Sequence, residues 1–270
     1  MTTTWEKVGK VAPRELSRAR LELHWAAQLP GAVGNALVTH RDDDSQEALE
    51  CVDDRSLLVG KATDTPTPLR VALSLPDLRV VVLDQELGEL ASLTLQGKTL
   101  EEGFTWLARE LEQRGGLDNP PALAVPDYDM PDHELATGGR FQFAQASAFE
   151  ELASWFRNGS RVLDKLEGTT LCWPHHFDIA VLDSIDDQKS VGTGLSPGDG
   201  SYDEPYWFVS PSPRPEGELP ALEKGHWHRE GFLAAILTGT DIVSDGGTEQ
   251  GPFVDTFIDN ATKIARKLLS

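Results

Sequence analysis

The stretch CWPHHFDIAV, from Cys172 to Val181, holds two neighbouring histidines and one aspartate among apolar residues. In an extended strand, successive side chains point to opposite faces, so residues i and i+2 share a face. One strand over the whole stretch would carry His176 and Asp178 on one face and mostly apolar side chains on the other. We predict a buried strand here, with an imidazole and a carboxylate side by side.

A second histidine pair follows in GHWHRE, which starts at residue 225. As a strand, it would place His226, His228 and Glu230 on one face and Trp227 on the other. If the two strands are neighbours with these faces aligned, the side chains converge into a ligand set suited to Zn²⁺ or Fe²⁺: His176, Asp178, His226 and His228. Such a metal lowers the pKa of a bound water to about 7, and Glu230 would act as the general base. The first hypothesis is therefore a metal-dependent, hydrolase-like enzyme that acts on a small polar substrate.

Two known kinds of metal site share part of this pattern. His-x-Asp followed by a distant histidine resembles the ligand triad of non-haem iron oxygenases, and His-x-His near a glutamate is similar to the cupins. In the cupins, however, the glutamate lies further from the second histidine than Glu230 does. Two alternatives stay open: a metal-free small-molecule pocket with aromatic walls, and histidines that only cap loops and hydrogen-bond backbone carbonyls.

A glycine-rich loop, SPGDGSYDEP, precedes the strongly strand-like YWFVS. Gly198 and Gly200 can bring the backbone close to a ligand, and Asp199 between them is a second candidate catalytic acid. Polar and aromatic side chains around this loop and around the histidine stretches are typical of small-molecule pockets. The candidate substrate-binding residues are Trp173, His175, Ser196, Tyr202, Glu204, Tyr206, Trp207 and Trp227. The alternative is a tight turn beside ordinary core tryptophans.

The chain has 270 residues, with 44 acidic and 24 basic side chains and a formal net charge of −20. An acidic surface repels phosphate groups, so we expect a small-molecule partner and no binding to nucleic acid or to a membrane. Two cysteines do not make a disulfide framework, and the first residues, MTTTWEKVGK, contain no apolar signal segment. These features predict a cytoplasmic protein.

Short apolar runs separated by turn-forming residues predict an antiparallel meander in the first half of the chain, and further strands later. The predicted strands cover residues 21–29, 32–39, 48–52, 56–59, 69–75, 78–83, 90–95, 190–195, 206–210 and 231–237. Capping boxes at Thr99-x-x-Glu102 and Ser147-x-x-Glu150 predict two helices, and residues 252–268 form a third amphipathic pattern. We therefore predict an α+β fold, with a mainly antiparallel β-sheet packed by about three α-helices. It would form a single domain over residues 19–270, preceded by a polar arm at residues 1–18.

Several segments resemble a bacterial family of unknown function, and the resemblance covers most of the chain, from about Leu21 to Pro213. They are GKTLEEGFTWLARELEQRG at 97–115, PDYDMPDH at 126–133, the helix at 149–166, LCWPHHFDIAVL at 171–182, GLSPGDGSYDEPYW at 194–207 and GHWH at 225–228. No activity is known for that family, so the resemblance implies a shared fold and no particular chemistry.

Overall fold

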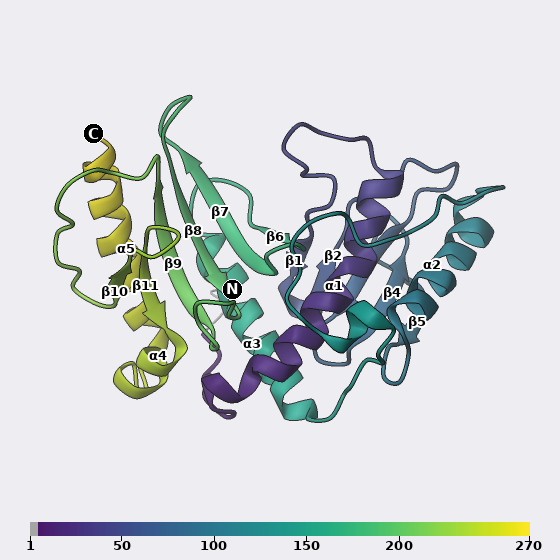
Figure 1. The fold of residues 1–270 in the computed structure, drawn as a ribbon, viewed down its shortest axis with the longest axis horizontal. Coiled ribbons are helices and arrows are strands. Elements are labelled where there is room, and N and C mark those ends of the chain that lie inside the picture. The colour runs from purple at the N-terminus through teal and green to yellow at the C-terminus, as the bar shows by residue number, and fades with distance from the viewer. Residues whose placement is uncertain (1–4) are drawn as a thin grey trace. The chain divides into compact units, whose positions relative to one another are not determined.

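The computed structural model describes residues 5–270 and shows an α+β protein with antiparallel sheets (Figure 1). The described chain contains five α-helices, so the prediction of an α+β fold is confirmed and that of about three helices is wrong. Residue contacts divide the chain into two compact units. The N-terminal unit comprises residues 18–153 and 171–177, and the C-terminal unit comprises residues up to 17, 154–170 and 178–270. Residues 1–4 of the predicted arm lie outside the described residues.

The N-terminal unit contains a five-stranded antiparallel meander in the order β1-β2-β3-β4-β5. Alternate side chains such as Leu57, Ala72 and Val81 form one buried cluster of this sheet. The meander predicted from the spacing of apolar runs and turn residues is confirmed in these five strands: β1 (Glu50–Val52), β2 (Leu57–Val59), β3 (Arg70–Ser74), β4 (Arg79–Leu83) and β5 (Glu89–Thr94).

Helix α1 (Ser17–Leu37) occupies the stretch 21–29 and all but the last two residues of 32–39, so the prediction of two strands there is wrong. Apolar residues at every second position, as in LELHWAAQL, suit a strand, but they also suit a helix that is buried on nearly all sides. Most of α1 between Ala19 and Gly34 is buried. A Cβ atom on Gly34 would lie 2.3 Å from the carbonyl oxygen of Gln46, so this glycine allows a close backbone approach.

Helix α2 (Leu100–Gly115) starts with the predicted capping box. The Thr99 hydroxyl accepts from the Glu102 backbone N–H at 3.1 Å, and the Glu102 carboxylate accepts from the Thr99 N–H at 2.8 Å. Gly116, with a φ of 71°, ends the helix. Helix α3 (Ala146–Leu163) lies where the second helix is predicted, and its residues from Ser154 onward belong to the C-terminal unit.

In the C-terminal unit the strands lie in the order β10-β11-β9-β8-β7, and all neighbours are antiparallel. Two helices follow the last strand: α4 (Gly239–Asp245) and α5 (Gln250–Leu269). The strands are β7 (Asp178–Ser184), β8 (Ser190–Ser196), β9 (Tyr206–Ser212), β10 (His226–His228) and β11 (Ala234–Thr238).

The stretch from Cys172 to Val181 is not the single strand predicted, because a tight turn interrupts it. Strand β6 (Leu171–Trp173) belongs to the N-terminal unit, and β7 begins only at Asp178. The backbone N–H groups of His176 and Phe177 both donate to the Trp173 carbonyl, at 3.1 and 2.6 Å, and Phe177 has a φ of 57°. Pro174 has no N–H for a continuous ladder, so the alternation of faces does not run through the turn.

Helix α5 and the part of α3 from Ser154 onward lie on one face of the C-terminal sheet (Figure 1). Gly159 of α3 lies so close to strands β7 and β8 that a Cβ atom there would be 2.5 Å from Ile179 Cδ1 and 2.9 Å from Leu195 Cδ2. Side chains alternate along a strand and cross-strand partners share a face, so the opposite face is defined by register. We call it the polar face; it carries Asp178, Ser196, Tyr206, Phe208, His226 and His228.

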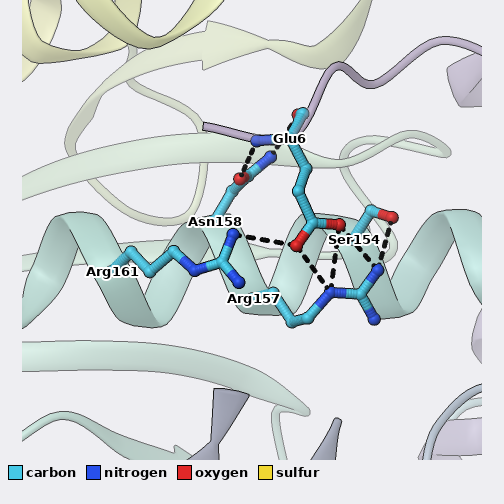
Figure 2. Close-up of polar contacts among 5 residues, drawn as sticks. All are labelled: Glu6, Ser154, Arg157, Asn158 and Arg161. Carbon is cyan, nitrogen blue, oxygen red and sulfur yellow. Dashed lines mark hydrogen bonds and ion pairs between the residues drawn. The ribbon is translucent and has the colours of Figure 1, made fainter. Parts of the chain in front are cut away.

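Residues 5–17 are held in the C-terminal unit by a charged cluster around Glu6 (Figure 2). The Glu6 carboxylate accepts hydrogen bonds from Arg157 and Arg161 of α3 at 2.7 to 3.1 Å. The Asn158 amide pairs with the Glu6 backbone in both directions. Hydrogen bonding from Arg157 is the main cause that lowers the pKa of Glu6. The two guanidinium groups are only 13% and 16% exposed, so this carboxylate offsets part of the cost of burying their charge.

Replacing Glu6 by glutamine should lower the free energy of unfolding by about 2 kcal/mol at pH 7, because two largely buried guanidinium groups lose their charged hydrogen-bond acceptor. A carboxyl group with a lowered pKa stabilises the fold above its unfolded pKa, and this contribution is lost as the pH falls through the folded value. The difference from wild type should therefore shrink as the pH is lowered from 7 to 3. Urea unfolding followed by circular dichroism measures it. Glu15→Gln, at an exposed position of the same segment, is the control; an equal loss in both variants would contradict the prediction.

Candidate functional site

The hydroxyl of Tyr202 lies between the two histidines of β10. Its oxygen is 3.0 Å from His226 Nε2 and 3.0 Å from His228 Nδ1. The loop between β8 and β9 carries Tyr202, and antiparallel pairing of β10 with β11 places both imidazoles on the polar face. The predicted alternation within HWH is thus what lets one hydroxyl reach both rings.

The hydrogen-bond partners determine the protons of this group when both histidines are neutral. His228 Nε2 lies 2.6 Å from the Glu230 carbonyl oxygen, which can only accept, so Nε2 carries the proton. His228 Nδ1 is then an acceptor for the Tyr202 O–H. The Tyr202 oxygen in turn accepts from the N–H of His226 Nε2. The result is a chain of three hydrogen bonds that runs from His226 through Tyr202 and His228 to the Glu230 carbonyl. The Nδ1 atom of His226 takes no part in this chain and can accept a hydrogen bond.

A second polar group adjoins Tyr202 on the polar face. Tyr206 donates to Asp199 Oδ2 at 2.6 Å, and the Tyr202 and Tyr206 ring centroids are 4.8 Å apart. The other carboxylate oxygen of Asp199 accepts from the backbone N–H groups of Ser201 and Tyr202, at 2.7 and 2.9 Å, which fixes the loop. Burial, followed by the negative charge of Asp199, raises the pKa of both tyrosines, so both hydroxyls keep their protons near neutral pH.

Asp178, the first residue of β7, adds a second carboxyl group. The residue keeps partial exposure, but its Oδ1 atom is shielded from solvent and has no hydrogen-bond partner among residues 5–270. Burial, with a further contribution from the charge of Asp199, raises the pKa of Asp178 to about 7. Asp178 can therefore gain or lose a proton near neutral pH, as an acid–base group must.

Two aromatic residues of this face are missing from the sequence prediction. Phe208 follows Tyr206 by two positions on β9, and their ring centroids are 6.3 Å apart. Phe232 stacks on His228 with centroids 4.2 Å apart. The period of two in YWFVS predicts that Phe208, and not Trp207, shares a face with Tyr206. Phe232 lies outside the strands, so no periodicity signals it.

Other predicted site residues of the C-terminal unit have different surroundings. Trp207 is fully buried on the helix-covered face, and Trp227 points away from the histidines, with its indole N–H donating to the Pro220 carbonyl at 2.8 Å. Glu204 is buried, accepts from the Thr240 backbone N–H at 2.6 Å and pairs with Arg14 at 3.2 Å. The prediction that Glu230 continues the strand face is wrong, because β10 ends at His228; Glu230 meets the histidine through its carbonyl.

The remaining predicted residues, Trp173, His175 and His176, belong to the N-terminal unit. There the His175 ring lies near the rings of Tyr128 and Trp173, with centroids 5.4 and 6.0 Å apart. The four predicted metal ligands are therefore distributed over both units. Within residues 5–270, no group of three or more His, Cys, Asp or Glu side chains is arranged to hold a metal ion.

The N-terminal unit also contains a groove of about 730 Å³. It lies along α2 and the extended segment 120–125, and it is lined by side chains such as Phe104, Leu123 and Leu135. Among the described residues that line it, Glu101 is the one with an ionisable side chain. The groove offers volume but few groups for chemistry, whereas the polar face combines hydroxyls, imidazoles and carboxyl groups.

No family model, no curated protein and no solved structure matches this chain. Among the helices within the described residues, none combines the length and the apolar character needed to cross a membrane.

Proposed function

We propose that the polar face of the C-terminal unit binds a small polar organic molecule, and that it does so without a metal. The contact that supports this most is the Tyr202 hydroxyl held by both His226 and His228. The rings of Tyr206 and Phe232 adjoin this group. Asp178 and Asp199 add two carboxyl groups. Aromatic walls with a few convergent polar groups are the usual composition of small-molecule sites.

The hydrogen bonds of the histidines favour this proposal over a metal-dependent hydrolase or oxygenase, which the spacing of histidines and acidic residues in the sequence suggests. Both ring nitrogens of His228 and the Nε2 atom of His226 already take part in hydrogen bonds. A metal coordinated by any of these nitrogens would have to break the chain that runs through Tyr202. Binding of an organic ligand needs no such rearrangement and can use His226 Nδ1 as an acceptor.

Thermal unfolding in the presence of small amines, alcohols, amides and carboxylic acids tests the proposal. A ligand present at about 100 times its Kd stabilises the native state by about 2.7 kcal/mol, which raises Tm by several degrees. We expect at least one compound class to do so, equally with and without EDTA. Tyr202→Phe should abolish most of the shift, because the loss of the hydroxyl releases both imidazoles.

Tyr128→Phe is the matched control, because it also removes a hydroxyl that donates a hydrogen bond, to Gln28 Oε1 in the N-terminal unit. Its ligand response should equal that of wild type. A shift that EDTA abolishes would support the metal-dependent enzyme instead. The proposal would be contradicted if no compound raised Tm, or if the Tm shift were unchanged in Tyr202→Phe.

A further inference from the structure

We infer that the ligand of the polar face carries a positively charged nitrogen, in the form of a primary ammonium group. The inference rests on the proposed function and names its ligand class. Three features carry it: an unpartnered carboxyl oxygen, a set of adjoining aromatic rings and a shortage of hydrogen-bond donors.

The unpartnered oxygen is Oδ1 of Asp178, which is shielded from solvent and has no hydrogen-bond partner among residues 5–270. A buried carboxyl oxygen without a partner is costly, and a second carboxyl group close by increases that cost. Asp199 is close enough for its charge to raise the pKa of Asp178. A ligand cation near both groups would remove the repulsion and favour the ionised form of Asp178.

Hydrogen-bond roles also favour a donor-rich ligand. The donors nearest to Asp199 are already committed: Tyr206 through its hydroxyl, and Ser201 and Tyr202 through their backbone N–H groups. The Tyr202 hydroxyl donates to His228. Of the acceptors that remain, Asp178 Oδ1 is the one close to Asp199, whereas His226 lies four strands away in the sheet order. An ammonium group offers three N–H donors and no acceptor, which complements a carboxyl oxygen that has no donor.

The rings that adjoin Asp199 suit a cation as well. Tyr202 lies 4.8 Å from Tyr206, 6.0 Å from His226 and 5.5 Å from His228, measured between ring centroids. Phe208 and Phe232 extend the group. The faces of tyrosine and phenylalanine rings attract cations within about 6 Å, and the formal charge of −20 raises the local concentration of cations.

Three probes of equal length that differ in charge test the inference: n-butylamine, which is a cation at pH 7.5, n-butanol and butyrate. Each is titrated into the full chain while the NMR signals of the His226 and His228 rings are followed. We expect butylammonium to bind about tenfold more tightly than either other probe. Asp178→Asn and Asp199→Asn should each weaken its binding by about tenfold, because amides keep the shape and the acceptor oxygen but lose the charge.

Asp187→Asn is the control, since it makes the same change of net charge at an exposed turn and should leave the Kd within about twofold. Circular dichroism and Tm show whether each variant is folded, and having two aspartate variants keeps the test informative if one is not. Equal affinity for n-butanol or butyrate would overturn the charge inference and leave the proposed function intact. No shift of the histidine signals with about 50 mM butylammonium would overturn the inference too. The proposed function fails separately, when no compound of the thermal panel gives a shift that depends on Tyr202.

Discussion

Replacement of Gly225 by alanine should destabilise the C-terminal unit by about 3 kcal/mol and release β10 from the sheet. Gly225 has a φ of 73°, which side chains rarely adopt, and a Cβ atom there would lie 2.1 Å from the carbonyl oxygen of Ile236 and 3.1 Å from the ring of Phe257. Ile236 is the β11 partner of His226, so the clash acts on the pair of strands that positions the histidines. Relief of the clash requires the backbone to move, because a carbonyl cannot rotate away as the end of a flexible side chain can.

Gly217→Ala is the matched control for this variant. Gly217 has a φ of 96°, and no atom would lie within 4 Å of a Cβ there, so only the backbone conformation is disfavoured, by about 1 kcal/mol. Urea unfolding of both variants gives the difference. In a folded Gly225→Ala protein, the NMR signals of His226 and His228 should show that the bonds to Tyr202 are lost. Equal unfolding free energies for the two variants would contradict the assigned close approach.

Replacement of Glu22 by glutamine should stabilise the protein at pH 8 by about 2 to 3 kcal/mol and by less than about 1 kcal/mol at pH 5. Glu22 lies on α1 with a side chain that is 1% exposed. Its Oε2 atom accepts from the Gln142 backbone N–H at 3.0 Å, and its Oε1 atom has no hydrogen-bond partner in the described chain, where His133 Nε2 lies 3.8 Å from it. Burial raises the pKa of Glu22 from 4.5 to about 7.

The sign of this pH dependence follows from the raised pKa. The folded state holds the proton of Glu22 more tightly than the unfolded state does, so its contribution to stability is complete below pH 4.5 and is lost as the pH rises through about 7. Glutamine stays neutral and keeps an acceptor for the Gln142 N–H, so the variant avoids this loss. Thermal unfolding of wild type and variant between pH 5 and pH 8 measures the effect.

Glu112→Gln is the control, because it makes the same change of net charge at an exposed position of α2. It shows how much of the stabilisation comes only from weaker repulsion between the negative charges of an acidic protein. A Tm difference between Glu22→Gln and wild type that does not change with pH would show that Glu22 is not protonated in the folded state at pH 5.

Local sequence signals predicted much of this architecture. The Thr99 and Glu102 pair forms the expected reciprocal cap, and turn residues between apolar runs correctly separate the five strands of the meander. Both features depend on residues only a few positions apart, which is why they can be recognised without the fold. Helix α1 shows the limit of such signals, because a helix buried on almost all sides lacks the polar stripe that identifies an amphipathic helix.

The candidate site was predictable only in part. The alternation of HWH correctly places His226 and His228 on one face and Trp227 on the other, since a strand of three residues requires only local geometry. The alternation of faces does not hold across Pro174, because the chain turns there. His176 and Asp178 therefore belong to different units. No pattern in the sequence indicates that the Tyr202 hydroxyl lies between the two imidazoles, or that Asp178 and Asp199 come close together.

The sequence by itself determined the α+β class, the capped helix α2, the meander of β1 to β5 and the common face of the two histidines. Each of these follows from the spacing of neighbouring residues, since backbone geometry and local hydrogen bonds act over a few positions. Only the tertiary structure decided which side chains meet on the polar face. Those contacts join residues brought together by the register of β7 to β11, and that register depends on how the whole sheet packs against α3 and α5.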